Sequence, residues 1–229
     1  MIQQRIKRKL YKLTHPVVGE IWMLHRVVEH VSNVPEQKEL EVTVAWLEQK
    51  INEYRSKGYT FVSIDNLPKH GRWVCLTFDD GYRDNHTLAY PMLKRLGVPF
   101  TVYVTTGFID NLSPMWWYPG EQLGISTEEL KTMDADPLCT IGAHTVSHPR
   151  LDTLTREQQY HEIAESKQTL EALLGHEIKH FSFPHGAHNK DTLSICRVLG
   201  FRTVVQSWGG PLRRGENPYP LPRINMTTK

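Results

Sequence analysis

The chain has 229 residues, of which 39% are hydrophobic and 23% charged, and its formal net charge is +2. These values favour one folded domain and exclude a disordered tail, a collagen-like fibre and a small disulfide-stapled protein. The near-neutral charge does not favour a nucleic-acid partner, and no apolar run is long enough to cross a bilayer. Histidine is frequent, with 12 copies, which is a first indication of metal or proton chemistry.

The beginning of the chain is basic and lacks the apolar core of a secretory signal, so we expect a cytoplasmic protein. Residues 1–19 are expected to hold a basic amphipathic helix, because Ile2, Ile6 and Leu10 recur at helical spacing within residues 2–13. This helix could pack on its own domain or rest on an anionic membrane surface. Three cysteines in apolar segments predict buried thiols rather than a disulfide framework: Cys75, Cys139 and Cys196.

Strand and helix patterns alternate along the rest of the chain. Apolar runs predict strands over residues 19–25, 59–64, 72–78, 99–106, 139–143, 180–183 and 201–206. Helical spacing and capping residues predict helices over residues 44–57, 84–97, 155–174 and 189–200, with a short one after Ser126. This α/β alternation predicts a single distorted or incomplete (β/α) barrel over residues 1–229, with about seven parallel strands and outer helices. Pro and Gly gather over residues 208–222, which predicts mostly loop there.

Three polar clusters directly follow predicted strands, where the active sites of such barrels lie. The clusters are Asp79 with Asp80, His144 with His148, and Pro184 with His185 and Gly186. Alone, Asp-Asp-Gly is a common turn and His-x-x-x-His is often two ordinary histidines. Together, two histidines on one side of a helical turn and a carboxylate from another strand can hold a divalent metal with open positions. A second carboxylate beside the metal would be free to act as a base.

These residues resemble the polysaccharide deacetylases of carbohydrate esterase family 4. The motif T-F-D-D-G stands at residues 77–81 and H-[ST]-x-x-H at residues 144–148, both intact and in the family's order. The third motif, R-x-x-F-x-x-P-[aromatic]-G, is partial, because Ile178 replaces the arginine and His185 the aromatic residue. The resemblance covers about residues 20–225. It implies removal of an N-acetyl group from an N-acetylated carbohydrate.

The resemblance also implies roles for single residues. Asp80, His144 and His148 would bind one divalent metal, and Asp79 would be the general base. Such a metal polarises the acetyl carbonyl and acidifies the attacking water. The turn at residues 184–186 would supply a backbone N–H to the oxyanion. These ligands suit zinc, which we expect, and also nickel, cobalt or iron.

The leaving amine needs a general acid, but the family's C-terminal histidine motif is absent from this sequence. The chain resembles a permuted branch, the poly-N-acetylglucosamine deacetylases, in which a motif near the N-terminus supplies that histidine. His25 occupies the corresponding place, and we expect it to be the acid; the alternative is a buried core histidine. The missing arginine of the third motif leaves Asp79 without its cationic neighbour. Arg223 or Arg26 could replace it, or could form ordinary structural salt bridges.

Aromatic side chains after two strands could stack on a sugar ring, namely Trp116, Trp117 and Trp208. The alternative is that these large side chains pack their loops onto the barrel. His185 and His188 could also hold a second metal.

The first functional hypothesis is therefore a metal-dependent N-deacetylase acting on a polysaccharide, an oligosaccharide or a lipid-linked sugar. It would be cytoplasmic, with membrane contact through residues 2–13 as an option. One alternative is an amidohydrolase of the same fold that acts on a small non-sugar amide. The other is a carbohydrate-binding relative without turnover, which the altered third motif would explain.

Overall fold

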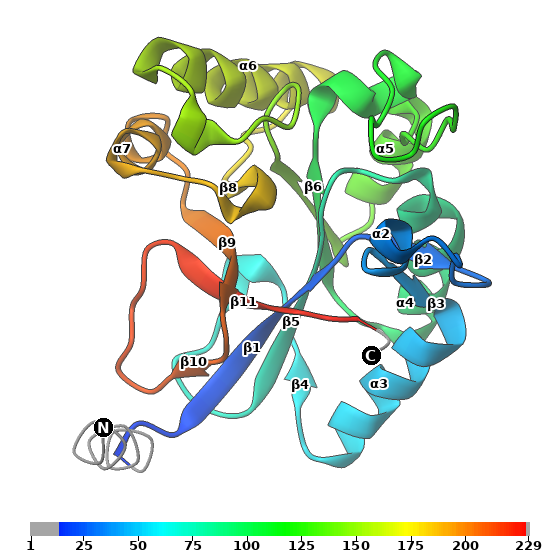
Figure 1. Cartoon of the computed structure of the whole chain (residues 1–229). Coiled ribbons are helices and arrows are strands. Elements are labelled where there is room, and N and C mark those ends of the chain that lie inside the picture. Colours follow the sequence, from blue (N-terminus) through cyan, green and yellow to red (C-terminus); the bar gives the residue numbers. More distant parts are fainter. Residues whose placement is uncertain (1–13, 228–229) are drawn as a thin grey trace.

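The computed structural model describes residues 14–227, so the helix expected over residues 2–13 lies outside the described part. Seven parallel strands close into a barrel with helices around it (Figure 1). In barrel order the strands are β1 (Val17–Leu24), β5 (Trp73–Phe78), β6 (Phe100–Val104), β7 (Cys139–Ala143), β8 (His180–Ser182), β9 (Thr203–Gly209) and β11 (Leu221–Asn225). The predicted (β/α) barrel of about seven strands is confirmed, and its ring of strand pairs is complete.

The barrel closes between the two ends of the chain, because β1 pairs with β5 on one side and with β11 on the other. The prediction of mostly loop over residues 208–222 is therefore wrong at its end, where β11 begins. Pro222 lies inside β11, and prolines at residues 218, 220 and 222 hid its strand pattern. The short β10 (Leu212–Arg213) pairs antiparallel with β1. Residues 17–19, expected within the N-terminal helix, belong to β1 instead.

Two further short pairings lie beside the barrel. Of the strand predicted over residues 59–64, β4 (Thr60–Phe61) alone pairs with β5. The segment after His25 forms β2 (Arg26–Val28), which pairs with β3 (Glu41–Thr43) in a separate two-stranded sheet.

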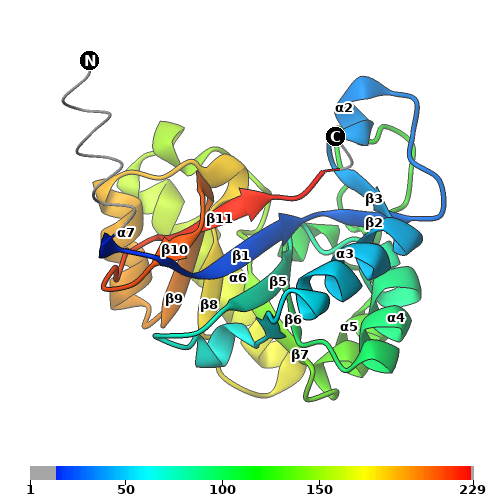
Figure 2. The same cartoon turned by 90° about the horizontal axis from the view of Figure 1, so that it is seen from below.

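Helices cover the outer face of the barrel (Figures 1 and 2). They are α3 (Val44–Ser56), α4 (Tyr90–Leu96), α5 (Thr127–Asp134), α6 (Arg156–Leu174) and α7 (Lys190–Val198), whereas the short α2 (Pro35–Lys38) lies between β2 and β3 and buries no residue. Both expected capping boxes are present, Ser126 with Glu129 and Thr155 with Gln158. The helix predicted over residues 84–97 divides into a π-helical turn and α4, at whose start Pro91 lies. Within residues 14–227, none of the helices combines the length and apolarity that a membrane span needs.

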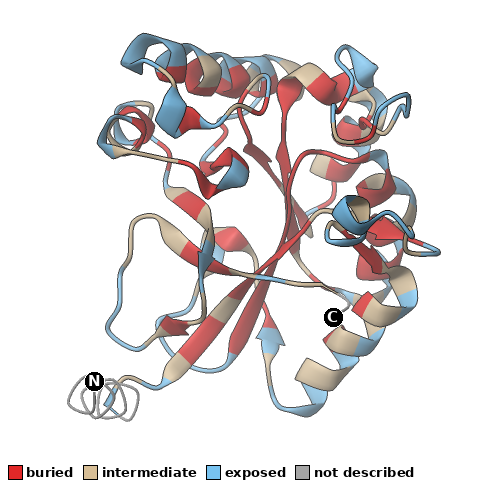
Figure 3. Ribbon diagram, in the orientation of Figure 1, coloured by how far each residue is buried: buried red, intermediate tan, exposed pale blue. Residues whose placement is uncertain are grey.

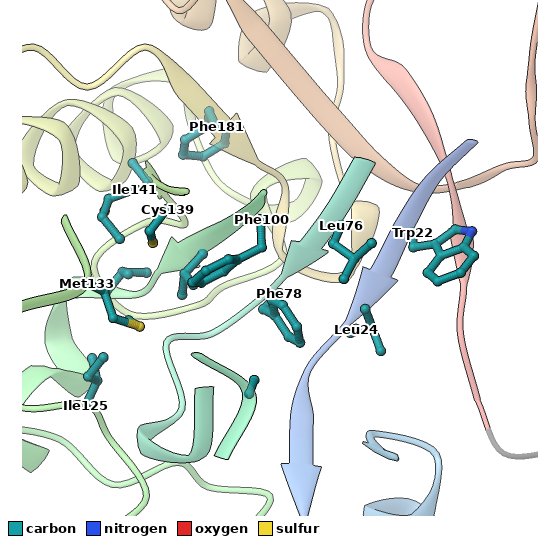
Figure 4. Packing of buried hydrophobic residues seen from close by; sticks show 14 of the residues in the cluster. Trp22, Leu24, Leu76, Phe78, Phe100, Ile125, Met133, Cys139, Ile141 and Phe181 are labelled. Carbon is teal, nitrogen blue, oxygen red and sulfur yellow. The ribbon is translucent and has the colours of Figure 1, made fainter. Parts of the chain in front are cut away.

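Side chains of β5 alternate between the barrel interior and the layer beneath the helices. Leu76 and Phe78 belong to the outer cluster (Figure 4), whereas Trp73 and Cys75 belong to a separate inner cluster. Strand β5 is accordingly buried along its whole length (Figure 3). Because side chains alternate along a strand, Asp79 continues the inward series at the mouth of the barrel. The three cysteines are buried free thiols, as predicted.

Candidate active site

The polar clusters meet at the carboxyl ends of the barrel strands. Asp79 and Asp80 follow β5, and His144 and His148 follow β7. The turn at residues 184–186 follows β8 directly. Because neighbouring parallel strands end at the same edge, segments far apart in the sequence share one site there.

Asp80, His144 and His148 converge on one point and are all buried. Asp80 Oδ1 lies 3.3 Å from His144 Nε2 and 3.2 Å from His148 Nε2. Ligand atoms about 2.0–2.1 Å from a tetrahedral metal lie roughly 3.3–3.4 Å apart, which is close to these separations. Asp80 Oδ1 is also buried without a hydrogen-bond partner in the described structure. The three side chains therefore fit a divalent metal.

The sequence argument assumed that the two histidines reach Asp80 from a helical turn. The structure shows that they do not. Thr145 and His148 have left-handed backbone conformations, with φ of 68° and 62°, so the motif forms a tight turn. Thr145 Oγ1 accepts a hydrogen bond from His148 N at 3.0 Å. Asp80 is left-handed too, with φ of 76°. Such conformations in non-glycine residues gather at functional sites, where the surrounding contacts hold them.

Asp79 is held by Arg223. Nη1 of Arg223 donates to Asp79 Oδ1 at 2.7 Å and Nη2 donates to Oδ2 at 2.6 Å, and both side chains are buried. Burial alone would raise the pKa of the Asp79 carboxyl, but the Arg223 guanidinium, together with His144 and His25, outweighs burial and the pKa is lowered. Asp79 is therefore a carboxylate at neutral pH.

Arg26, the other arginine considered for Asp79, binds elsewhere. Its Nε donates to Asp84 Oδ2 at 2.7 Å, and Nη1 lies 3.3 Å from Glu41 Oε1. The guanidinium also lies over the Tyr118 ring, 4.7 Å from its centroid. Arg26 thus joins β2, β3 and the loop before α5, whereas Arg223 meets Asp79.

His25 follows β1 beside the Asp79 segment, because Leu24 pairs with Phe78 in the register of β1 and β5. Its carbonyl accepts a hydrogen bond from Asn85 Nδ2 at 2.8 Å. Burial lowers the pKa of the His25 imidazole below 6.5, and the carboxylates of Asp80 and Asp79 partly oppose this. His25 is thus within the electrostatic reach of both carboxylates.

The three tryptophans differ in their surroundings. Trp117 is half-buried, with its ring 4.9 Å from that of His148, and its Nε1 donates to Tyr82 Oη at 2.6 Å. This residue packs its loop onto the site, as the structural alternative expected. Trp116 and Trp208 keep 68% and 53% of their surface exposed. Trp208 packs so closely on Gly186 that a Cβ there would lie 2.3 Å from its ring.

His185 and His188 contact different partners. The His185 ring lies 4.6 Å from the His148 ring, and burial together with His148 lowers the pKa of His185 to about 4. His188 stacks on Phe183, and its Nδ1 lies 2.8 Å from the Gly186 carbonyl oxygen. The group of possible metal ligands found among residues 14–227 includes neither histidine.

Sequence reasoning missed Ser182. Its hydroxyl accepts from Arg223 Nη2 at 2.9 Å and donates to Asp79 Oδ2 at 3.2 Å. Its carbonyl oxygen lies 2.8 Å from His144 Nδ1, which directs the opposite ring nitrogen towards Asp80. Ser182 could have been found, because it stands between Phe181 and Phe183 in the third motif, and side chains alternate along a strand, so that of Ser182 faces away from those of both phenylalanines.

A buried aspartate beside a carboxylate–histidine group, at the mouth of a (β/α) barrel, is an arrangement that suits a hydrolytic enzyme. A family model described as polysaccharide deacetylase matches residues 66–204. The chain belongs to the polysaccharide deacetylase family, as its motifs predicted.

Individual relatives are similar to this chain over most of their own length. The Bacillus subtilis protein YxkH is 29% identical over 220 residues, which cover 94% of this chain and 74% of that protein. The poly-beta-1,6-N-acetyl-D-glucosamine N-deacetylase of Staphylococcus aureus (strain MSSA476) is 23% identical over 220 residues. The alignment covers 88% of this chain and 73% of that protein. The structure of Streptococcus pyogenes deacetylase PplD in complex with acetate has 27% identity and a TM-score of 0.76, with 93% of each chain covered.

Proposed function

We propose that this protein is a metal-dependent N-deacetylase that removes acetyl groups from an N-acetylated carbohydrate related to poly-N-acetylglucosamine. The observation that carries the proposal is the buried Asp79–Arg223 pair beside the convergent Asp80, His144 and His148. The similarity to the Staphylococcus aureus poly-N-acetylglucosamine deacetylase supports the choice of substrate class.

Asp80, His144 and His148 would hold the metal, and two imidazole nitrogens with one carboxylate oxygen suit zinc. When bound, the metal would supply Lewis-acid chemistry at the acetyl carbonyl and at the attacking water. His144 is directed by the Ser182 carbonyl, which favours the tautomer with a proton on Nδ1 and leaves Nε2 free as a ligand.

Asp79 would take the proton of the attacking water. The bidentate contact with Arg223 supports this role in two ways: it keeps the carboxylate ionised, and it fixes the direction of its oxygens. Oδ2 accepts from both Arg223 and Ser182, whereas Oδ1 accepts from Arg223 Nη1 and has a second lone pair left for the incoming proton. Because the pKa of Asp79 is lowered, the carboxylate is a weak base and relies on an acidified water.

His25 would give a proton to the leaving amine as the C–N bond breaks. Its place after β1, beside Asp79 and within the field of Asp80, supports this role. The turn formed by Pro184, His185 and Gly186 would offer a backbone N–H to the oxyanion. Trp116 and Trp208, exposed near the site, would contact neighbouring sugar rings. The cytoplasmic location stays a prediction.

The direct test is acetate release from N-acetylglucosamine oligomers, with and without a chelator. We expect release that the chelator abolishes and that Asp79→Asn reduces strongly. Hydrolysis of a small cyclic amide without release from any acetylated sugar would instead support the amidohydrolase alternative. Sugar binding without release, unchanged in Asp79→Asn, would support the non-catalytic one.

A further inference from the structure

His25 stands alone between two strands that belong to different sheets. β1 ends at Leu24 and pairs with β5 and β11 in the barrel, whereas β2 begins at Arg26 and pairs with β3 outside it. The chain therefore leaves the barrel sheet at His25, and neither strand includes this residue. The direction of the His25 side chain depends on what holds the backbone on both sides of it.

The segment that follows β5 supplies these contacts. Asp79 N donates to the carbonyl oxygen of Leu24 at 2.9 Å, just before His25. Asn85 Nδ2 donates to the carbonyl oxygen of His25 itself at 2.8 Å. Asn85 is fully buried, so water does not compete for this hydrogen bond.

Asp84 holds the two residues that come after His25. Its Oδ2 accepts from Arg26 Nε at 2.7 Å, and its Oδ1 accepts from Val27 N at 3.1 Å. Asp84 is 9% exposed and also lies close to Asn85, whose Nδ2 is 3.4 Å from Asp84 Oδ1. Two adjacent side chains thus fix the backbone at His25 and directly after it.

The geometry of this segment is unusual in two respects. Asn85 begins a π-helical turn, Asn85–Ala89, and such turns are frequent at functional sites. Among the described residues, Asn85 Oδ1 is also buried without a hydrogen-bond partner. An unpartnered buried oxygen lowers stability, and such a group in a folded protein calls for an explanation. The hydrogen bond from the same amide to His25 offers one.

We propose that Asp84 and Asn85 are positioning residues that aim the His25 imidazole at the leaving amine. This inference rests on the proposed function, in which His25 gives the proton. A catalytic group displaced by about 1 Å can lower the rate about 100-fold, so the support of its backbone matters. Residues 79–85 would then carry the base, one metal ligand and the support of the acid on one short segment.

The test variant is Asn85→Leu, which removes the donor to the His25 carbonyl with little change in volume. Asp84→Asn is a second variant, which keeps the shape of the side chain and removes its charge. The matched control is Gln159→Leu on α6, because Gln159 is another buried amide that donates to a backbone carbonyl, that of Leu154 at 3.0 Å.

Three quantities are measured on each protein. The first is acetate release from N-acetylglucosamine oligomers, resolved into kcat and KM. The second is hydrolysis of p-nitrophenyl acetate, whose phenolate leaves without needing a proton from an acid. The third is the rise in thermal unfolding temperature on adding zinc, which reports whether the metal ligands are in place.

We expect Asn85→Leu to lower kcat for the oligomers at least about tenfold, with KM and the ester rate within about twofold of wild type. The shift with zinc should be kept, because Asn85 is not among the converging ligands. Asp84→Asn should lower kcat in the same selective way. The control should keep both rates. Equal losses with the oligomers and with the ester would overturn the inference and indicate a structural role.

The double variant shows whether Asn85 acts through His25. In the His25→Ala protein, Asn85→Leu should lower kcat no further, because the group that it positions is gone. An additive loss would overturn the inference. If His25→Ala itself released acetate at the wild-type rate, the proposed acid would fail and this inference with it. If His25→Ala lost the release and Asn85→Leu kept it, the inference alone would fail.

Discussion

Arg223 and Asp79 are 144 positions apart in the sequence, yet they share two parallel hydrogen bonds of 2.7 and 2.6 Å. Arg223 lies in β11 and Asp79 follows β5, and β1 lies between these strands and pairs with both. The contact therefore exists only because the barrel closes. One residue of the pair comes from β11, which is the last barrel strand in the sequence. The other belongs to the motif that follows β5.

Replacing Arg223 by Met should strongly destabilise the protein. It would leave the Asp79 carboxylate buried and unpaired, which costs about 3–5 kcal/mol in comparable buried pairs. Urea denaturation measures the free energy of unfolding. As a control, Arg83→Met removes an exposed ion pair with Glu129 and should cost about 1 kcal/mol or less. If Arg223→Met lowered the free energy of unfolding by less than about 1 kcal/mol, the result would contradict a buried, ionised pair.

Replacing His25 by Ala should lower turnover by about 100-fold or more, because the leaving amine would lack its proton donor. The metal content should not change, since His25 is not among the three converging ligands. Acetate release and elemental analysis measure the two quantities. His161→Ala, at an exposed position of α6, serves as the control. Turnover close to wild type would show that His25 is not the acid.

The metal site can be tested without an activity assay. Zinc should raise the thermal unfolding temperature of the metal-free protein, because a ligand that binds only the folded state stabilises it. His148→Ala should remove most of this shift, and one metal per chain should be found in the wild type. His188→Ala is the matched control, because its Nδ1 contacts the Gly186 carbonyl instead. An equal shift in wild type and His148→Ala would exclude this site.

His180 should make stability fall in mild acid. Burial lowers the pKa of this side chain below 6.5, although the neighbouring Asp65 opposes the effect. A neutral ring can donate from Nε2 to Asp65 Oδ1 at 3.0 Å and accept at Nδ1 from Thr203 Oγ1 at 2.8 Å. The unfolded chain binds a proton near pH 6.5 that the folded protein does not bind. This stability is therefore fully present above 6.5 and is lost as the pH falls towards the folded pKa.

The measurement is the free energy of unfolding in urea between about pH 7.5 and pH 5.5. His180→Gln cannot titrate in this window, so its stability should change less with pH than that of the wild type. Parallel curves for the two proteins would refute the assignment.

Local features of the fold could be predicted from the sequence because neighbouring residues produce them. The capping boxes at Ser126 and Thr155 depend on contacts within a single turn, and both are present. The continuous apolar run of β5 predicted a strand buried on both faces. The position of each polar cluster directly after a strand also followed from local order. That is why the metal-ligand candidates could be named before their geometry was known.

Other features depend on contacts between distant segments, and the sequence left them open or indicated the wrong answer. Arg223 was the expected partner of Asp79 and Arg26 a second possibility, and the pairing of β1 with β5 and β11 is what brings Arg223 to Asp79. Ser182 escaped notice because its role depends on two partners from other strands. The His-x-x-x-His segment is not helical, because Thr145 and His148 have left-handed backbone conformations that their surroundings hold.

Residue types and their order along the chain thus named the candidates: an aspartate expected to act as a base, three possible metal ligands and a histidine at a strand's end. Barrel closure decided how they meet. Which strands become neighbours is a property of the whole ring, and no local segment encodes it. The orientation and ionisation of Asp79 follow from that closure, because its guanidinium partner arrives on the last strand of the chain.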